Sequence, residues 1–454
     1  MVVGDTIAAI ATAPGRGGVA VVRVSGPESF DIARKLTERA WEACATRGTR
    51  EIGVARIHPP GPHDAQGLSV IDEAVILAFK GPNSYTGEDV VEFQCHGGTV
   101  TPRRVLEACL AAGTRLARRG EFTERAFLNG KIDRDQAESV LDLIDAKTTR
   151  AADAALEGLA GRRRRECRAL YEAALDLSTR LEHALDIDEG ELPGDFRESI
   201  NSQLSTLNSQ LRAAIAKATE GRLLRSGALV VLAGPPNAGK SSLLNALLEE
   251  NRAIVSEVPG TTRDAIEAWI DLDGWPIRLM DTAGLRETED EVEGEGVKRS
   301  EDLIAKADVV LMLRSCGVEG LRRGDRPPQP LDLSASQLLN VTSKCDLGRG
   351  GGLNVSAKTG EGLDELKRAI VAKLEEKVAA ADEGDVPEGD VAAYHESLVM
   401  LDGGRETQGA RSEEDLVLMA NAVRSVAERL GVAVGATYST DMLDKLFSRF
   451  CVGK

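Results

Sequence analysis

An eight-residue stretch with the chemistry of a phosphate-binding loop, Gly-Pro-Pro-Asn-Ala-Gly-Lys-Ser, occupies residues 234–241. It matches the pattern G-x-x-x-x-G-K-[ST], follows the apolar run 228–233 and precedes the helix-like run 242–248. In such a loop, backbone N–H groups turn toward a polyphosphate, Lys240 neutralises phosphate oxygens, and the Ser241 hydroxyl can bind Mg²⁺. The stretch therefore predicts binding of a nucleoside triphosphate.

The residues after this loop complete the pattern of a GTPase. The run Trp-Pro-Ile-Arg-Leu-Met predicts a strand that ends at Asp281, and Asp-Thr-Ala-Gly then matches D-x-x-G. Asp281 can reach a bound metal through water, and the N–H of Gly284 can meet a γ-phosphate. Between the two motifs lies Gly-Thr-Thr-Arg-Asp at residues 260–264. We expect Thr262 of this stretch to bind Mg²⁺ while the γ-phosphate is present and to dissociate from the metal after hydrolysis. In this order on one α/β segment, the three motifs indicate GTP hydrolysis.

The choice of base depends on Ser-Lys-Cys-Asp at residues 343–346, which stands where GTPases typically carry N-K-x-D. The carboxylate of Asp346 can accept from guanine N1–H and from the exocyclic amine, a pair of donors that adenine lacks. Ser343 replaces the asparagine whose amide normally braces the loop, so we expect weaker guanine affinity. Ser-Ala-Lys at residues 356–358 is the candidate for the loop whose backbone N–H faces guanine O6.

The attacking water has no obvious partner in the usual place. Leu285 follows the D-x-x-G motif, where many GTPases use glutamine to orient the water. Because the leucine side chain cannot form hydrogen bonds, another residue must orient the attacking water. Residues 287–295 supply several carboxylates, most of which we interpret as solvated charges. The side-chain oxygen of Asn237 can coordinate a monovalent cation over the phosphates, giving the positive charge that an arginine finger supplies elsewhere.

The composition is that of a multidomain globular protein. A chain of 454 residues is long enough for about three domains. It has no apolar run of about 18 residues and no basic-then-apolar leader, so we expect no membrane span, no secretory signal and a cytoplasmic location. Seven cysteines without a C-x-x-C pair and five scattered histidines predict reduced thiols and no structural zinc.

The formal net charge of −17 argues against broad electrostatic binding to nucleic acid, so any RNA contact must be local or shared with a partner. The one compact basic run, residues 162–165, we interpret as a solvated helix face.

The pattern along the chain predicts an α/β plus α protein. Residues 1–130 contain strand-like runs at 18–24 and 73–79 between glycine and proline clusters, which indicates a compact α/β domain. Apolar residues then recur at helical spacing. The expected domains are 1–130, a helical domain formed by 131–226 and 377–454, and an inserted nucleotide-binding domain at 227–376, with a linker at 377–390.

Several motifs together resemble the MnmE (TrmE) family of tRNA modification GTPases. Within the GTPase segment these are G-x-P-N-x-G-K-S, G-T-T-R-D and D-T-A-G-L-R-E. Outside it, the chain carries A-P-G-R-G-G-V-A at 13–20, G-P-N-S-Y-T-G-E-D-V-V-E at 81–92, H-G-G at 96–98, G-E-F-T-E-R-A-F-L-N-G-K at 120–131 and F-C-V-G-K at 450–454. The resemblance therefore spans the whole chain.

The resemblance implies a homodimer with a tetrahydrofolate-binding, dimerising N-terminal domain, a helical domain and an inserted Ras-like P-loop GTPase domain. The folate would be 5,10-methylenetetrahydrofolate or 5-formyltetrahydrofolate. The family works as a heterotetramer with MnmG, which alone carries FAD, to add an aminomethyl or carboxymethylaminomethyl group at C5 of the tRNA wobble uridine. Potassium and dimerisation of the two GTPase domains activate its hydrolysis of GTP.

The resemblance also assigns residues to each site. The expected K⁺ ligands are Asn237, Ser256, the carbonyl of Val258, and Thr261, and the expected Mg²⁺ ligands are Ser241 and Thr262. Glu293 matches the glutamate that positions water. The full expected GTP-binding set is Asn237, Ala238, Gly239, Lys240, Ser241, Ser242, Ser256, Thr261, Thr262, Asp281, Thr282, Ala283, Gly284, Lys344, Asp346, Ser356, Ala357 and Lys358.

For the folate, the matching residues are Arg23, Glu92, Lys131 and Lys454. Arginine and lysine can pair with folate carboxylates, and a glutamate can accept from pterin N–H groups, although each residue taken singly is more often a surface charge. Cys451 is a candidate for a direct catalytic role, and a packing role fits it equally well.

Two departures and one alternative stay open. Arg314 stands where a GTPase strand usually continues apolar, and residues 314–336 show few strand or helix signals. The alternative function is a ribosome-assembly or regulatory GTPase switch without one-carbon chemistry. Such proteins usually append an RNA-binding module after the GTPase domain, whereas here a large domain precedes it.

Overall fold

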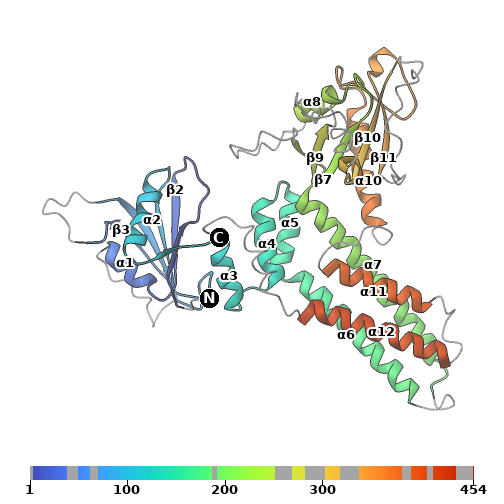
Figure 1. Ribbon diagram of the computed structural model, residues 1–454, viewed down its shortest axis with the longest axis horizontal. Coiled ribbons are helices and arrows are strands. Elements are labelled where there is room, and N and C mark those ends of the chain that lie inside the picture. Colours follow the sequence, from blue (N-terminus) through green and yellow to red (C-terminus); the bar gives the residue numbers. More distant parts are fainter. Residues whose placement is uncertain are drawn as a thin grey trace. The chain divides into compact units, whose positions relative to one another are not determined.

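The computed structural model describes residues 4–37, 50–61, 70–186, 192–250, 268–281, 302–316, 337–380, 390–405, 413–435 and 453. Contacts divide the chain into two compact units, one formed by Met1–Leu141 with Thr437–Lys454 and the other by Asp142–Ala436. The elements of each unit are labelled in Figure 1. Within the described ranges, no helix is long and apolar enough to cross a membrane.

The first unit is built on a six-stranded sheet. Its strands lie in the order β3 (Arg50–Ile57), β4 (Asp72–Phe79), β5 (Val90–His96), β2 (Val19–Ser25), β1 (Ile7–Ile10) and β6 (Arg115–Leu116). Every neighbouring pair is antiparallel except β1 and β6, which are parallel.

The two faces of this sheet carry different side chains because successive residues of a strand point to opposite sides. One face packs Val22 and Val24 of β2 against α1 (Ser29–Thr37) and α2 (Thr101–Ala111) in an apolar core. On the other face, Ile7 and Ala9 of β1 pack against Phe122 of α3 (Glu121–Leu128). Arg23 alternates with Val22 and Val24, so it lies on the α3 face.

The second unit contains a second six-stranded sheet, in the order β12 (Leu353–Val355), β11 (Leu338–Ser343), β10 (Val309–Ser315), β7 (Ala228–Ala233), β9 (Trp275–Asp281) and β8 (Ala268–Leu272). The pairs are parallel except β8 with β9. All six residues of β7 are apolar and buried, as expected for a central parallel strand covered on both faces. The helices α8 (Lys240–Glu250) and α10 (Leu363–Ala379) contribute to the larger core on this sheet.

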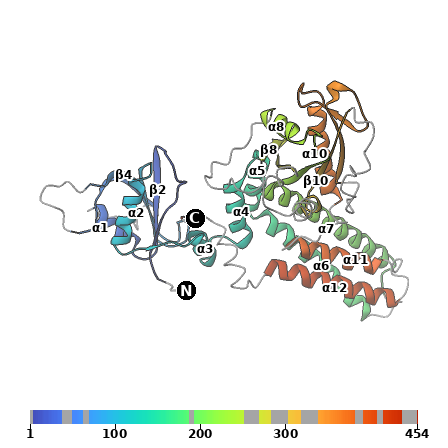
Figure 2. The same cartoon turned by 45° about the horizontal axis from the view of Figure 1, so that its top comes forward.

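Four long helices form a separate apolar core in the second unit. They are α6 (Arg162–Leu185) and α7 (Phe196–Ser226), which precede the second sheet in the chain, and α11 (Asp390–Arg405) and α12 (Glu413–Gly435), which follow it. Figures 1 and 2 show α11 and α12 alongside α6 and α7. The nucleotide-binding segment is thus inserted between two halves of one helical core.

Two shorter helices precede α6 in the chain. α4 (Arg134–Asp145) crosses the boundary between the units, and α5 (Thr149–Leu159) follows it. The side chain of Thr148 caps α5 by accepting from the N–H of Ala151 at 3.2 Å.

The fold class predicted from the sequence is confirmed, with local differences. β10 continues through Arg314, whose side chain is exposed, and α10 runs to Ala379, beyond the expected domain end at 376. Gly453 lies against the carbonyl of Ile10 in β1, so closely that a Cβ would clash, whereas the sequence placed residues 377–454 in the helical domain. The expected domain boundaries themselves stay predictions.

Candidate nucleotide-binding site

The loop between β7 and α8 has a backbone that requires glycine at two places. Gly234 has φ +148°, and a Cβ there would lie 2.5 Å from the carbonyl oxygen of Leu313 in β10. Gly239 has φ +87°, a left-handed conformation that side chains disfavour. The strand, loop and helix follow one another in the order that the sequence predicted. The loop also lies at the carboxyl end of parallel strands, where α/β sheets bind their ligands.

Two side chains at the start of α8 form hydrogen bonds with the phosphate loop and with β9. The Nζ of Lys240 donates to the carbonyls of Gly234 and Pro235 at 3.1 and 3.0 Å, so the loop curls around a buried amine. The hydroxyl of Ser241 donates to Oδ2 of Asp281 at 2.7 Å, joining α8 to the end of β9. A serine hydroxyl and an aspartate carboxylate are oxygen ligands of the kind that Mg²⁺ takes beside phosphates. These residues fit the expected metal site.

The loops after β11 and β12 bring together the residues expected to read the base. The hydroxyl of Ser356 donates to Oδ1 of Asp346 at 2.8 Å, which fixes the carboxylate. Lys344 adopts a left-handed conformation with φ 58°, and its Nζ donates to the carbonyl of Asn237 at 3.0 Å. The base loop and the phosphate loop are therefore tied to each other directly.

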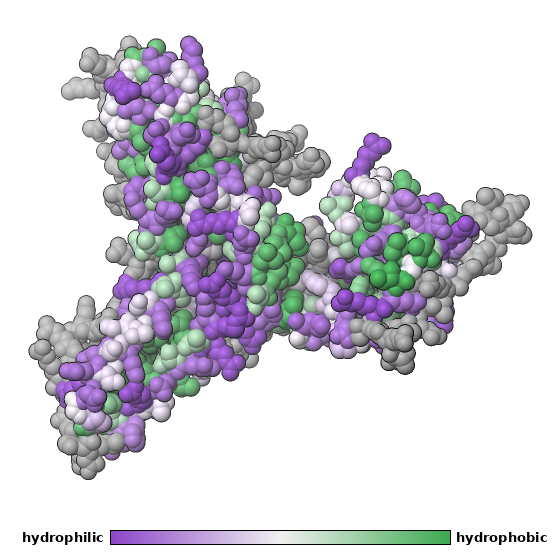
Figure 3. Space-filling view, turned by 180° about the vertical axis from the view of Figure 1, so that it is seen from behind, coloured by the Kyte–Doolittle hydropathy of each residue, from purple (hydrophilic) through white to green (hydrophobic). Residues whose placement is uncertain are grey.

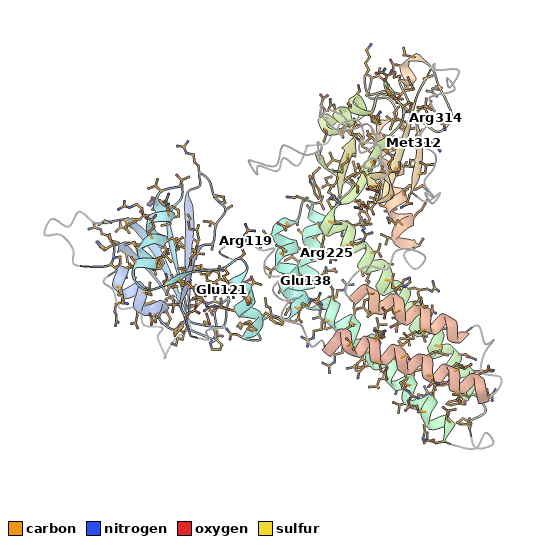
Figure 4. All side chains as sticks on the ribbon, in the orientation of Figure 1. Arg119, Glu121, Glu138, Arg225, Met312 and Arg314 are labelled. Atoms are coloured by element: carbon orange, nitrogen blue, oxygen red, sulfur yellow. The ribbon has the colours of Figure 1, made fainter. Side chains whose placement is uncertain are left out.

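Ser343 contacts the phosphate loop from the base loop. Its hydroxyl lies 2.6 Å from the carbonyl oxygen of Ala238 and 3.2 Å from that of Arg314, and the residue is buried. A hydroxyl therefore makes this contact where an asparagine would use its amide, and the weaker guanine affinity expected from the sequence stays a prediction. Figure 4 labels Arg314 in this part of the molecule.

A second group of expected site residues meets on the α3 face of the first sheet. Arg23 and Glu92 are direct neighbours on β2 and β5, and their Nε and Oε1 atoms lie 2.8 Å apart. The guanidinium of Arg23 also lies over the rings of Tyr85 and Phe122, 5.1 and 5.5 Å from their centroids. Lys131 donates to the carbonyl of Pro82 at 2.9 Å, in the segment that leads to Tyr85.

An ion-pair network supports this face of the sheet. Arg125 of α3 pairs with Asp5 at 2.7 Å and with Glu88 at 3.0 Å, while Glu121 accepts from Arg115 at 2.6 Å. Burial alone raises the pKa of Glu121, but hydrogen bonds from Arg115 and the Arg118 N–H outweigh burial and leave this pKa below its usual value. Figure 4 labels Glu121, which lies in α3. The network fixes α3 beside Arg23.

Two glycine-rich motifs line a cavity on the other side of the first unit. The cavity has a volume of about 570 Å³ and is lined by residues of the segment before β2, including Arg16, and by Gly97, Gly98 and Thr99 before α2. Gly97 lies so close to the carbonyl of Gly17 that a Cβ would clash. The close approach requires glycine at residue 97.

Comparison with known proteins identifies the family. The family model described as GTP-binding protein TrmE N-terminus matches residues 6–131, and the MnmE helical domain model matches residues 135–451. A tRNA modification GTPase MnmE of Symbiobacterium thermophilum is 41% identical over 99% of both chains. Another protein of that name, from Heliobacterium modesticaldum, is 39% identical over 100% of both chains. This chain belongs to the MnmE family of tRNA modification GTPases.

A solved structure also matches part of the chain. The G domain of the T. maritima FeoB iron transporter is 27% identical, and the match covers 32% of this chain and 98% of that one. The TM-score is 0.23, too low to add to the assignment. Membership of the MnmE family rests on the full-length relatives and the two family models.

Several residues that the MnmE resemblance assigned lie outside the described residues. They are Ser256, Val258, Thr261, Thr262, Thr282, Ala283, Gly284, Glu293, Cys451 and Lys454. Their roles stay predictions. The remaining residues fall into two groups within the described part of the chain, one around Lys240 and Asp346 and one around Arg23 and Glu92.

Sequence reasoning missed the aromatic side of the second group. Tyr85 and Phe122 both stood in motifs that carried the MnmE resemblance, but no role was drawn for them. The Tyr85 hydroxyl lies 2.8 Å from Oγ1 of Thr123, and burial raises the pKa of this tyrosine. A signal was present in the sequence, because arginine often lies over aromatic rings in proteins and both aromatic residues stand in the quoted motifs.

Proposed function

We propose that this protein hydrolyses GTP as part of a reaction that adds an aminomethyl or carboxymethylaminomethyl group at C5 of the tRNA wobble uridine. The observation that carries the proposal is the joint presence of full-length membership in the MnmE family and a phosphate loop whose Ser241 contacts Asp281. A partner with FAD, of the MnmG type, would complete the chemistry. Because the substrate is tRNA, the protein would act in the cytoplasm.

For GTP hydrolysis, each described residue has a part to play. Lys240 would leave the carbonyls of Gly234 and Pro235 and neutralise phosphate oxygens, a short movement for a flexible side chain. Ser241 and Asp281 would hold Mg²⁺, directly and through water, with Thr262 as a second ligand. Bound Mg²⁺ supplies positive charge to the β- and γ-phosphates.

Potassium would supply the positive charge that an arginine finger supplies in other GTPases. Asn237 lies at the turn of the phosphate loop with φ 62°, and its carbonyl is already occupied by Lys344. Its side-chain oxygen is the atom proposed for K⁺, together with Ser256, Val258 and Thr261. Glu293 would position the attacking water, a task that Leu285 cannot perform.

The one-carbon group would come from a tetrahydrofolate held on the α3 face of the first sheet. Glu92 offers a carboxylate to pterin N–H groups, and Arg23, Lys131 and Lys454 offer cations to folate carboxylates. The rings of Tyr85 and Phe122 beside Arg23 add flat apolar surface suited to a pterin. The position of Gly453 against Ile10 supports the assignment of Lys454 to this unit.

Exposed apolar side chains on the first sheet support a homodimer. Ile52 and Val54 of β3 are 67% and 62% exposed, and Val75 of β4, the cross-strand partner of Val54, is 36% exposed. Figure 3 shows hydrophobic side chains gathered on the visible surface of the first unit. A second copy of the chain is the occupant that the family implies. A Val54→Glu change would then yield a monomer in light scattering, and an unchanged dimer mass would contradict this interface.

The contacts between the GTPase segment and the helices support coupling of hydrolysis to movement. Thr148, before α5, donates to the carbonyl of Gly274 at 2.7 Å, in the turn between β8 and β9. The guanidinium of Arg150 lies 4.1 Å from the ring centroid of Trp275 at the start of β9. Because β9 ends at Asp281, a change at the metal site can reach α5 through one strand. GTP hydrolysis would thus open and close the dimer.

Mass analysis of wobble uridines from cells that lack this protein tests the proposal. We expect the C5 modification to disappear and to return with the wild-type gene, but not with an Arg23→Ala or a Ser241→Ala variant. Unmodified uridine in the wild type, or unchanged nucleosides in the deletion strain, would refute the role in tRNA modification.

A further inference from the structure

The serine that opens the base-reading motif has only one proton to give, and the geometry shows where it goes. Ser343 Oγ lies 2.6 Å from the carbonyl oxygen of Ala238 and 3.2 Å from that of Arg314. Both neighbours are carbonyls, which can only accept. The hydroxyl therefore donates to the phosphate loop, and its proton is unavailable to any other group.

This use of the proton limits what Ser343 can offer to a base. Guanine presents N1–H and an amine as donors on one edge and N7 and O6 as acceptors on the other. Asp346, fixed by Ser356, suits the donor edge, and a backbone N–H of the loop at 356–358 suits O6. N7 needs a donor. An asparagine at residue 343 would have two N–H donors, enough for the Ala238 carbonyl and for N7, but a serine has one.

The surroundings of Ser343 favour the hydrogen bond from its hydroxyl to the Ala238 carbonyl. The residue is 4% exposed, and Gly239 lies beside its Oγ. If the hydroxyl turned to a base, the buried carbonyl of Ala238 would lose this donor at a cost of roughly the free energy of a hydrogen bond. The lysine of the motif, Lys344, donates to the carbonyl of Asn237.

We propose that Ser343 is a positioning residue that braces the phosphate loop, and that this protein reads guanine without a hydrogen bond to N7. The inference rests on the proposed binding of GTP and makes its base recognition specific. Among the residues that the structure describes, Asp346 and the O6 contact then select guanine. Nucleotides altered at N7 are accepted as well as GTP and GDP.

Calorimetry with GDP and 7-deaza-GDP, which replaces N7 by carbon, tests this on the full wild-type chain with Mg²⁺ and K⁺. We expect dissociation constants within about twofold of each other, since no hydrogen bond is lost. A penalty of about fivefold or more for the 7-deaza nucleotide, the effect of one neutral hydrogen bond, would overturn the inference and leave GTP binding intact. If neither nucleotide bound, both this inference and the proposed GTPase function would fail.

Variants at residue 343 distinguish the effect of the hydroxyl hydrogen bond from the effect of side-chain packing. Ser343→Thr keeps the hydroxyl and should keep both affinities and their ratio. Ser343→Ala removes the brace and should weaken GDP and 7-deaza-GDP alike, on the order of tenfold. Ser343→Asn adds a donor and should create a 7-deaza penalty of about fivefold that the wild type lacks. If the ratio of the GDP and 7-deaza-GDP affinities changed in Ser343→Ala, this would contradict the account, because a residue that does not contact N7 cannot alter that ratio.

Discussion

Asp308, just before β10, joins the GTPase segment to the helices at both ends of the insertion, and its loss should be costly. Its Oδ2 accepts from the N–H of Leu229 in β7 at 2.8 Å, and its Oδ1 accepts from Lys377 of α10 at 2.9 Å. Arg222 of α7 lies farther away, at 3.6 Å. The carboxylate thus lies where the chain enters the segment through α7 and leaves it through α10.

The cost of Asp308→Ala can be worked out from these contacts. The side chain of Asp308 is 8% exposed, so the N–H of Leu229 would lose a charged acceptor in a buried place, at about 1.5–3 kcal/mol. The pair with Lys377 is partly exposed and adds at most about 1 kcal/mol. The more distant pair with Arg222 adds little. We expect a loss of about 3 kcal/mol for Asp308→Ala and about 1 kcal/mol for Asp308→Asn, which keeps an acceptor oxygen.

Urea unfolding followed by tryptophan fluorescence measures this locally. Of the three tryptophans, Trp269 and Trp275 lie in β8 and β9 of the same sheet. With a slope of about 1–3 kcal/mol per M, a loss of about 3 kcal/mol lowers the midpoint by about 1–3 M urea. The control is Glu376→Ala, which removes an exposed pair with Lys373 on α10 and should leave the midpoint almost unchanged. Equal midpoints for the wild type and Asp308→Ala would refute the reasoning.

Three further predictions concern the two sites. Ser241→Ala should weaken GDP binding at least about tenfold with Mg²⁺ but hardly at all with EDTA, measured with a fluorescent GDP; equal loss in both would exclude the metal role. Asp346→Asn should shift preference from guanine toward xanthine nucleotides in competition assays, and unchanged guanine preference would contradict its role as acceptor. Arg115 and Arg125 hold the pKa of Asp5 below its usual value, although burial opposes this, and the pKa of Glu121 is also lowered. A carboxyl group whose pKa is lower in the folded than in the unfolded state stabilises the fold above its unfolded pKa, and this stabilisation is lost as the pH falls through its folded pKa. We therefore expect α3 to lose hydrogen-exchange protection below about pH 4. In Glu121→Gln this loss should be less steep.

The sequence predicted the parts of the GTPase site that depend on local spacing. The order of strand, loop and helix around Lys240 follows from glycine positions and from a continuous apolar strand. Asp281 ends β9 as expected, because alternation and composition locate the strand. Neighbouring parallel strands then bring Asp281 to Ser241 without further information.

What the sequence could not supply are contacts between distant segments. Ser343 and Ala238 are 105 residues apart, and only the packing of β11 beside the phosphate loop reveals that a hydroxyl reaches the carbonyl. The contact of Arg23 with Tyr85 and Phe122 joins three segments that are distant in the sequence. The docking of Gly453 on β1 likewise depends on tertiary packing, which helical periodicity near the C-terminus does not disclose.

GTP turnover by the purified full chain, in KCl and in NaCl at equal ionic strength with Mg²⁺, tests the central claim most directly. The account predicts measurable hydrolysis that is faster in KCl and that is lost in Lys240→Ala. Equal rates in the two salts, or no hydrolysis of GTP in either, would contradict it.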